Sequence, residues 1–184
     1  MKKIITVGVT GGIACYKAAE VVNELVKRDF EVNVIMTKNA TEFMTPLTFQ
    51  TLSRNKVLTD MFDKVDKWDT EHISIAQKTD LFAIIPATGN FIGKLASGIA
   101  DDMLLTTVMA TKSTVIIAPA MNTAMWENPI VQDNIEKLRK YNYLVLETGS
   151  GRLACGDVGS GKLLQWQVIV EKIIQEINHQ TQDV

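Results

Sequence analysis

Short apolar runs alternate with longer amphipathic stretches along most of this chain. Four of the runs are rich in β-branched residues and a fifth is weaker; they cover residues 4–9, 31–36, 81–85, 114–118 and 143–146. Continuous apolar runs of this length are typical of strands that are buried on both faces of a parallel sheet. The stretches between them have helical length, and in residues 18–26 the apolar positions recur three and four residues apart. The alternation predicts helical crossovers between parallel strands.

The expected fold is therefore a single α/β domain over residues 1–178, an open, doubly wound parallel sheet of the Rossmann-like or flavodoxin-like kind with helices on both faces. Pro86 and Pro119 are expected to end their strands, because proline has no N–H group to donate. Three segments fall outside the alternation. Residues 53–70 carry mixed charge without a period, which favours a surface loop or a segment that faces a partner. Residues 148–163 contain five glycines, which favours a flexible clamp, and residues 179–184 form a polar tail.

Composition narrows the possible partners and the compartment. The chain has 184 residues, with 19 Lys and Arg against 21 Asp and Glu, and a formal net charge of −2. Because there is no basic run, the sequence gives no electrostatic footprint for nucleic acid. The apolar start is too short for a signal peptide, and no window approaches the roughly 18 apolar residues of a membrane span, so we expect a cytoplasmic protein without membrane contact. Two cysteines far apart in the sequence cannot form a disulfide framework.

Small and polar residues follow each of the four stronger strands. They are Thr10-Gly11-Gly12, Thr37-Lys38-Asn39, Pro86 to Asn90, and Pro119 to Asn122. In an open α/β sheet a ligand binds where the carboxyl ends of the strands meet, and these residue types expose backbone N–H groups there. Gly11-Gly12 could hold a phosphate or simply form a tight turn. The segment lacks the Gly-x-Gly-x-x-Gly spacing of dinucleotide sites and the Gly-Lys-Ser/Thr ending of a P-loop, so neither cofactor class is indicated.

Few reactive side chains are available for catalysis. His72 is a candidate general base, with a surface or capping histidine as the alternative. Cys155, among the glycines of the expected clamp, is a candidate proton donor or nucleophile, whereas Cys15 is expected to be a packed small residue. Asn122 could hold a carboxylate or amide, or cap the next short helix. No His and Cys spacing predicts a metal site, and no Gly-x-Ser-x-Gly elbow predicts a hydrolase.

Two motifs combine these candidates in a specific pattern. They are Pro119-Ala120-Met121-Asn122-x-x-Met125-Trp126 and Arg152-Leu153-Ala154-Cys155-Gly156. Together they resemble the flavin-containing cysteine decarboxylase family, and the resemblance extends from Ile4 to about Lys172, with Gly11 to Ala14, His72 and residues 101–105 included. Where the family has Pro-Ala-Ser-Ala-Asn-Thr, this chain has Pro86-Ala87-Thr88-Gly89-Asn90-Phe91, so Phe91 replaces a hydroxyl residue.

The resemblance implies FMN as the cofactor and phosphopantothenoylcysteine, a small molecule of coenzyme A biosynthesis, as the substrate. The implied reaction oxidises the cysteinyl thiol, releases CO₂ and reduces the resulting enethiol, which gives 4'-phosphopantetheine. His72 would be the base, Asn122 would hold the substrate's carboxylate or amide, and Cys155 would donate a proton in the final reduction. The implied FMN contacts are Gly11, Gly12, Ile13, Thr37, Lys38, Asn39, Thr88, Gly89, Asn90, Phe91 and Ala120.

The same resemblance places Arg152, Leu153 and Ala154 in a substrate clamp, with Arg152 a candidate phosphate partner. It implies a homotrimer or a multiple of trimers with FMN sites at subunit contacts, so that His72 could serve the flavin of its own copy or of a neighbouring one. Many family members are fused to the synthetase that makes the substrate; this chain ends at Val184, so a separate synthetase is the expected partner.

Two other functions remain open. A peptidyl-cysteine decarboxylase would use the same flavin and base and would leave an oxidised product, but Cys155 argues against it. A non-catalytic flavin-binding regulatory subunit is disfavoured because His72, Asn122 and Cys155 are all present.

Overall fold

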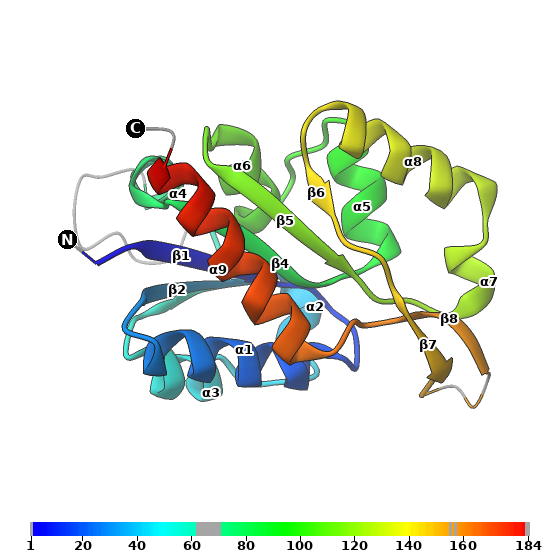
Figure 1. The fold of residues 1–184 in the computed structure, drawn as a ribbon, viewed down its shortest axis with the longest axis horizontal. Coiled ribbons are helices and arrows are strands. Elements are labelled where there is room, and N and C mark those ends of the chain that lie inside the picture. The colour runs from blue at the N-terminus through cyan, green and yellow to red at the C-terminus, as the bar shows by residue number, and fades with distance from the viewer. Residues whose placement is uncertain (1, 62–70, 155, 157, 183–184) are drawn as a thin grey trace.

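A parallel sheet of six strands lies at the centre of the protein, within the residues that the structure describes (Figure 1). This computed structural model describes residues 2–61, 71–154, 156 and 158–182. The strand order is β3-β2-β1-β4-β5-β6. The chain therefore adds strands on one side of β1 up to β3 and on its other side from β4 on, which makes the gap between β1 and β4 the switch point of the sheet. In an open α/β sheet this switch point is where a ligand binds. The strands are β1 Ile4–Val9, β2 Glu31–Met36, β3 Val57–Leu58, β4 Leu81–Ala87, β5 Thr114–Pro119 and β6 Leu144–Val145.

Helices cover both faces of the sheet (Figure 1). On one face α1, α3 and α9 pack over a core that contains Val22, Phe49 and Ile173. On the other face α5, α6 and α8 pack over a core that contains Leu104 and Ile135. None of the helices in the described part of the chain is long and apolar enough to cross a membrane. The helices are α1 Cys15–Lys27, α2 Lys38–Thr41, α3 Pro46–Ser53, α4 Glu71–Lys78, α5 Gly89–Ala96, α6 Met103–Ala110, α7 Thr123–Trp126, α8 Pro129–Lys140 and α9 Trp166–Gln182.

The doubly wound fold predicted from the apolar pattern is confirmed. Every residue of β4 is buried, as a continuous apolar run predicts for a central strand. In α1 the buried residues Ala18, Val21, Val22 and Leu25 form the stripe that the three-and-four spacing indicates. The spacing of apolar residues along the chain therefore predicts both where the strands lie and which faces of the helices cover them.

The structure corrects the prediction at Pro86 and in residues 53–70. Pro86 does not end its strand, because β4 continues to Ala87, whose carbonyl oxygen accepts a hydrogen bond from Ala120 N at 3.0 Å. The pairing of β4 with β5 shifts register between Ile84 and Ala87. Pro86 therefore lies at an irregularity where the hydrogen bonds between the two strands require no N–H group from it. Val57–Leu58 is an edge strand that pairs with β2 rather than part of a loop. Residues 62–70 lie outside the described residues.

The glycine-rich segment contains an antiparallel hairpin. Its strands are β7 (Gly149–Arg152) and β8 (Val158–Lys162). Cys155 and Asp157, which come between them in the sequence, lie outside the described residues. Helix α9 continues to Gln182, so residues 179–182 of the expected polar tail are helical. Within that extension Gln180 Nε2 donates a hydrogen bond to Thr114 Oγ1 at 2.9 Å.

The core assignment predicts a difference in stability between two isoleucine variants. Ile84 in β4 is 0% exposed, whereas Ile130 in α8 is 71% exposed. Replacing Ile84 by Ala should lower the free energy of unfolding by about 2–5 kcal/mol, because a cavity remains in the core. The same change at Ile130 should alter it by less than about 0.5 kcal/mol. Urea unfolding followed by circular dichroism measures both values, and equal losses would contradict the assignment of Ile84 to the core.

Candidate active site

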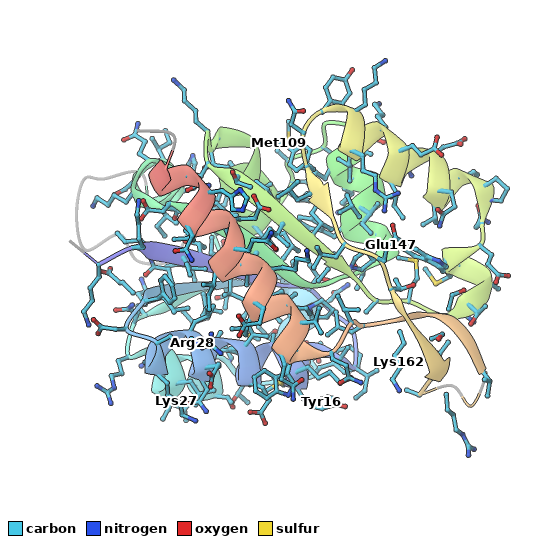
Figure 2. All side chains as sticks on the ribbon, in the orientation of Figure 1. Tyr16, Lys27, Arg28, Met109, Glu147 and Lys162 are labelled. Atoms are coloured by element: carbon cyan, nitrogen blue, oxygen red, sulfur yellow. The ribbon has the colours of Figure 1, made fainter. Side chains whose placement is uncertain are left out.

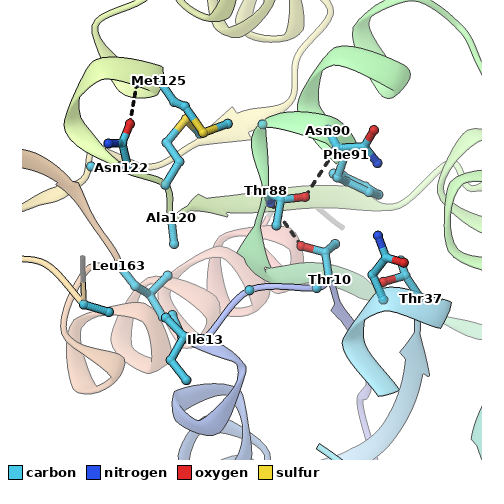
Figure 3. A pocket seen from close by; sticks show the side chains of 18 of the residues that line it. Thr10, Ile13, Thr37, Thr88, Asn90, Phe91, Ala120, Asn122, Met125 and Leu163 are labelled. Carbon is cyan, nitrogen blue, oxygen red and sulfur yellow. Dashed lines mark hydrogen bonds between the residues drawn. The ribbon is translucent and has the colours of Figure 1, made fainter. Parts of the chain in front are cut away.

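A cavity of about 1000 Å³ lies at the carboxyl ends of β1, β2, β4 and β5 (Figure 3). Residues at the starts of α1, α2, α5 and α7 line it, and the β7–β8 hairpin contributes further lining residues. The cavity therefore occupies the sheet edge at which the sequence places its small and polar residues. Its position also matches the usual ligand site of an open α/β sheet.

Each predicted cofactor and clamp residue lines this one cavity. The parallel topology explains this, since it brings strand ends that are far apart in the sequence to the same edge of the sheet. The predicted residues found there are Gly11, Gly12, Ile13, Thr37, Lys38, Asn39, Thr88, Gly89, Asn90, Phe91, Ala120, Asn122, Arg152, Leu153 and Ala154.

The buried hydroxyl group of Thr10 connects the ends of β1 and β4. Its Oγ1 donates a hydrogen bond to the carbonyl oxygen of Pro86 at 2.6 Å and accepts one from Thr88 N at 3.0 Å. Thr10 is 1% exposed, so water does not compete effectively for these bonds. The two bonds fix the distance between the Gly11-Gly12 turn and the start of α5. Sequence analysis places Thr10 at the end of β1 but gives no sign of this bridging role.

The N-terminus of α5 presents unpaired backbone N–H groups to the cavity. Thr88 caps the helix, because its Oγ1 accepts a hydrogen bond from Phe91 N at 3.3 Å. The described residues offer no acceptor to the N–H groups of Gly89 and Asn90. The side chain of Phe91 is 2% exposed and packs in the core, so its backbone rather than its side chain contributes to the turn. An eight-residue helix that begins in this way is suited to binding an anion.

Gly11 and Gly12 have different structural roles. A Cβ atom on Gly11 would lie 2.4 Å from Asn39 Cβ and 2.8 Å from the Asn39 carbonyl carbon, so only glycine allows β1 to approach α2 this closely. A Cβ on Gly12 would lie no closer than 3.6 Å to another residue. Gly12 therefore keeps cavity space open.

Thr37 caps α2 opposite this turn, its Oγ1 accepting a hydrogen bond from Ala40 N at 3.3 Å.

Asn122 has the capping role that was one of its two predicted alternatives. Its Oδ1 accepts a hydrogen bond from Met125 N at 2.9 Å, which caps α7 (Figure 3). This bond fixes the orientation of the side-chain amide and leaves Nδ2 as the group that can donate to a ligand. Because Asn122 also lines the cavity, capping and ligand binding are compatible at this residue. An amide held in this way favours a carboxylate or carbonyl oxygen as its partner.

Strand β8 packs closely against the segment that carries Asn122. Met121 N donates a hydrogen bond to the Gly161 carbonyl oxygen, and Thr123 Oγ1 donates one to the Ser160 carbonyl oxygen, both at 2.9 Å. Gly161 has φ +101°, and a Cβ there would lie 2.6 Å from the Met121 carbonyl oxygen. The hairpin therefore has a fixed strand beside Asn122.

Apolar side chains form the remaining wall of the cavity. Ile13, Ala120, Met125 and Leu163 lie around it in Figure 3. Ile13 is 58% exposed and Met125 is 47% exposed, so both present apolar surface to the cavity that a ligand could cover. A flat aromatic group would cover this surface, while the polar strand ends would bind the rest of the ligand.

Of the predicted catalytic residues that the structure describes, Asn122 lines the cavity and His72 does not. His72 lies in the first turn of α4, which Figure 1 shows near the N-terminal end of β1 and away from α7 and the hairpin. Cys155 lies outside the described residues. Cys15 is buried, as predicted for a packed small residue, and burial raises the pKa of its thiol.

Several charged residues of the cavity belong to no motif of the sequence. Lys17, Lys94 and Lys162 all line it. Lys94 forms an ion pair with Asp101, and the Lys94 ammonium lowers the pKa of that exposed carboxyl group. Lys17 lies one helical turn after Ile13, a spacing that could have indicated a common face; nothing in the local sequence of Lys162 indicates its place.

Comparison with known proteins supports the family resemblance. The family model described as "Flavoprotein" matches residues 1–178. The coenzyme A biosynthesis bifunctional protein CoaBC of Borreliella burgdorferi is 47% identical over 176 residues, which are 96% of this chain and 45% of the relative. The CoaBC protein of Bacillus subtilis is 48% identical over 89% of this chain and 40% of its own length. This chain therefore spans less than half the length of these relatives.

A third relative has a similar length. The probable phosphopantothenoylcysteine decarboxylase of Streptococcus mutans is 42% identical over 96% of this chain and 100% of its own length. The structure of the FMN-dependent cysteine decarboxylase SpaF is 30% identical and aligns with a TM-score of 0.80 over 96% of this chain and 97% of SpaF. A phosphopantothenoylcysteine decarboxylase mutant, 24% identical, has the same fold with a TM-score of 0.85 over 95% of this chain and 98% of that chain. This chain belongs to the flavoprotein family.

Proposed function

We propose that the protein is a phosphopantothenoylcysteine decarboxylase of coenzyme A biosynthesis, which uses FMN to convert 4'-phospho-N-pantothenoyl-L-cysteine to 4'-phosphopantetheine and CO₂. One observation carries this proposal. The predicted FMN contacts, Asn122 and the described clamp residues line a single cavity at the switch point of the sheet. The relatives named for this activity support the choice of substrate.

The cavity has the groups that FMN requires. The N–H groups of Gly89 and Asn90 at the start of α5 have no protein acceptor in the described residues and suit a phosphate. Gly12 leaves open space beside Thr88, and the exposed apolar side chain of Ile13 suits a flat ring. FMN would supply a reversible two-electron acceptor, so that the overall decarboxylation consumes no external oxidant.

The chain's own residues would bind and orient the substrate. Asn122 Nδ2 would donate a hydrogen bond to the substrate's carboxylate or amide, since Oδ1 is occupied by Met125 N. The hairpin would cover the substrate through Arg152, Leu153 and Ala154, and the bonds from Met121 and Thr123 would keep β8 beside Asn122. Cys155 would provide the proton for the final reduction, a role that rests on the family motif.

The proposed base must come from a second copy of the chain. His72 does not line the cavity of its own chain, so a neighbouring copy would bring it to the substrate. We therefore propose a homotrimer, or a multiple of trimers, with each site shared between two copies.

The proposal also extends to partners and location. The substrate would be made by a phosphopantothenoylcysteine synthetase, and a separate synthetase stays a prediction, as does the cytoplasmic location. The alternative of a peptidyl-cysteine decarboxylase stays open, since SpaF is named as an FMN-dependent cysteine decarboxylase without a stated substrate. The two functions differ in their products, because only the proposed enzyme reduces the enethiol.

The shared site predicts complementation between two inactive variants. Asn122→Asp keeps an oxygen that can cap α7 but loses the Nδ2 donor and adds a negative charge, so kcat/KM should fall at least about 100-fold while the fold is retained. His72→Asn should also be inactive while it still binds FMN. When the two variants are co-expressed, about a quarter of the sites should combine an intact Asn122 with an intact His72, so activity should return.

Two controls accompany this measurement. The absorption spectrum of bound FMN shows that each variant is folded and loaded, and co-expression of differently tagged copies of the same variant should stay inactive. Activity of His72→Asn alone would remove His72 from the mechanism. Absence of complementation in isolated mixed oligomers would contradict the shared site.

A second prediction tests the proposed reaction through its product. Cys155→Ser should still release CO₂, because decarboxylation precedes the proposed proton donation. The enethiol product should then accumulate to about one equivalent per bound FMN without oxygen, since the two electrons cannot return to the substrate. Mass spectrometry of the product, with wild type as the control, measures this outcome. Formation of saturated 4'-phosphopantetheine at the wild-type rate would remove Cys155 from the mechanism.

A further inference from the structure

Neighbouring strands are joined at the carboxyl edge of the sheet, and one of these joints differs from the others. The ends of β2 and β1 are joined through the backbone, where Thr37 N donates a hydrogen bond to the Val9 carbonyl oxygen at 3.0 Å. The ends of β5 and β4 are joined in the same way, where Ala120 N donates to the Ala87 carbonyl oxygen at 3.0 Å. Between β1 and β4 a side chain, that of Thr10, makes the joint.

The backbone pairing of β1 with β4 stops before β4 ends. It extends to Gly8 and Ile84, and β4 continues beyond that pair. Past this ladder, the hydrogen bonds that join the two strand ends within the described residues are those of Thr10. Its hydroxyl group donates to the Pro86 carbonyl oxygen at 2.6 Å and accepts from Thr88 N at 3.0 Å.

The helices that follow the two strands lie on opposite faces of the sheet, so their packing does not join the strand ends. Helix α1 packs on the face that α9 also covers, and α5 packs on the other face with α8. Tyr16 and Lys27 label the first and last turns of α1 in Figure 2, and Figure 1 shows α5 beyond the sheet. The chain therefore diverges at this switch point, and the cavity opens between the Gly11-Gly12 turn and the start of α5.

The hydroxyl group of Thr10 forms its bonds inside the protein rather than to a ligand. A hydroxyl group has one proton, and that of Thr10 goes to the Pro86 carbonyl oxygen, so none is left for a molecule in the cavity. Thr88, whose N–H group Thr10 accepts, in turn accepts a hydrogen bond from Phe91 N and caps α5. Thr10 therefore acts on the cavity through Thr88 and the start of α5.

We infer that Thr10 is a positioning residue for FMN: its hydroxyl group holds the Gly11-Gly12 turn and the start of α5 at the separation at which one FMN molecule contacts both. Segments that are held in place before binding lose less conformational entropy when the ligand arrives, so the affinity is higher. The inference rests on FMN as the cofactor of the proposed function, but not on the substrate proposed there.

The test measures the affinity for FMN in two substitutions of Thr10. Thr10→Val keeps the shape of the side chain and removes the hydroxyl group, which leaves the Pro86 oxygen and Thr88 N without their partner. The FMN-loaded protein is diluted, and the return of free-flavin fluorescence gives the Kd. This Kd should rise at least about tenfold in Thr10→Val. Thr10→Ser keeps the hydroxyl group, so its Kd should stay within about threefold of the wild-type value.

Thr6→Val is the matched control, because it removes a second buried hydroxyl group, this one within β1. Thr6 is 0% exposed, and its hydroxyl group bonds to that of Thr79 at 2.6 Å. Neither of these two residues lines the cavity. Both valine variants should unfold at a lower urea concentration than wild type, since each leaves a buried polar group without its partner. Only Thr10→Val should weaken FMN binding.

Three outcomes would overturn the inference. Equal weakening of FMN binding in Thr6→Val and Thr10→Val would attribute the effect to lost stability. Unchanged binding in Thr10→Val, or a loss in Thr10→Ser as large as in Thr10→Val, would show that the hydroxyl group is not what matters. If Thr10→Val does not fold, Thr10→Ala removes the hydroxyl group without placing a methyl group against the Pro86 oxygen, and Thr6→Ala is then its control.

Failure of the proposed function has a separate signature. A wild-type protein that binds FMN but releases no CO₂ from phosphopantothenoylcysteine would contradict the function, and the Kd values of the threonine variants would still decide the role of Thr10. A wild-type protein that binds no FMN when titrated with it would overturn the inference.

Discussion

The hydroxyl group of Thr10 provides the contact on which the geometry of the cavity depends. It bonds to the Pro86 carbonyl oxygen and to Thr88 N, and thereby joins the ends of β1 and β4 at the switch point of the sheet. The Gly11-Gly12 turn and the start of α5 follow these two strand ends directly. The ladder between β1 and β4 extends only to Gly8 and Ile84, so beyond it these two bonds join the strand ends, and a ligand that contacts both segments depends in part on one buried side chain.

The rest of the site follows from helices that begin at the same edge. Thr37, Thr88 and Asn122 each cap a helix with a side-chain oxygen. Capping uses one N–H group of each helix, and at the start of α5 the N–H groups of Gly89 and Asn90 have no acceptor among the described residues. A chain with a net charge of −2 can therefore offer backbone dipoles to a phosphate group, while Lys17, Arg152 and Lys162 add positive charge to the cavity lining.

The amino-acid sequence predicts the fold well because its strands are buried on both faces. The run in residues 81–85 has no polar position that would fit a helix surface, and all of β4 is buried. Parallel topology then brings Gly11, Thr37, Thr88 and Asn122 to one edge without any further information. The end of a strand also depends on its register with the neighbouring strand, which the sequence does not show. The pairing of β4 with β5 shifts register between Ile84 and Ala87, so Pro86 fits inside β4 and does not end it.

Contacts between distant segments could not be predicted in this way. Thr10 bonds to residues more than 70 positions away, and no local pattern shows that pairing. Lys17 and Lys162 line the same cavity only because the fold brings α1 and the hairpin to it. The place of His72 outside the cavity of its own chain is likewise a property of the assembled fold.

The most direct measurement is anaerobic turnover of the FMN-loaded wild-type protein with phosphopantothenoylcysteine. The account predicts CO₂ and 4'-phosphopantetheine in equal amounts, over many turnovers for each FMN and without an added oxidant. Absence of CO₂, or an enethiol product that never exceeds the amount of bound FMN, would contradict it.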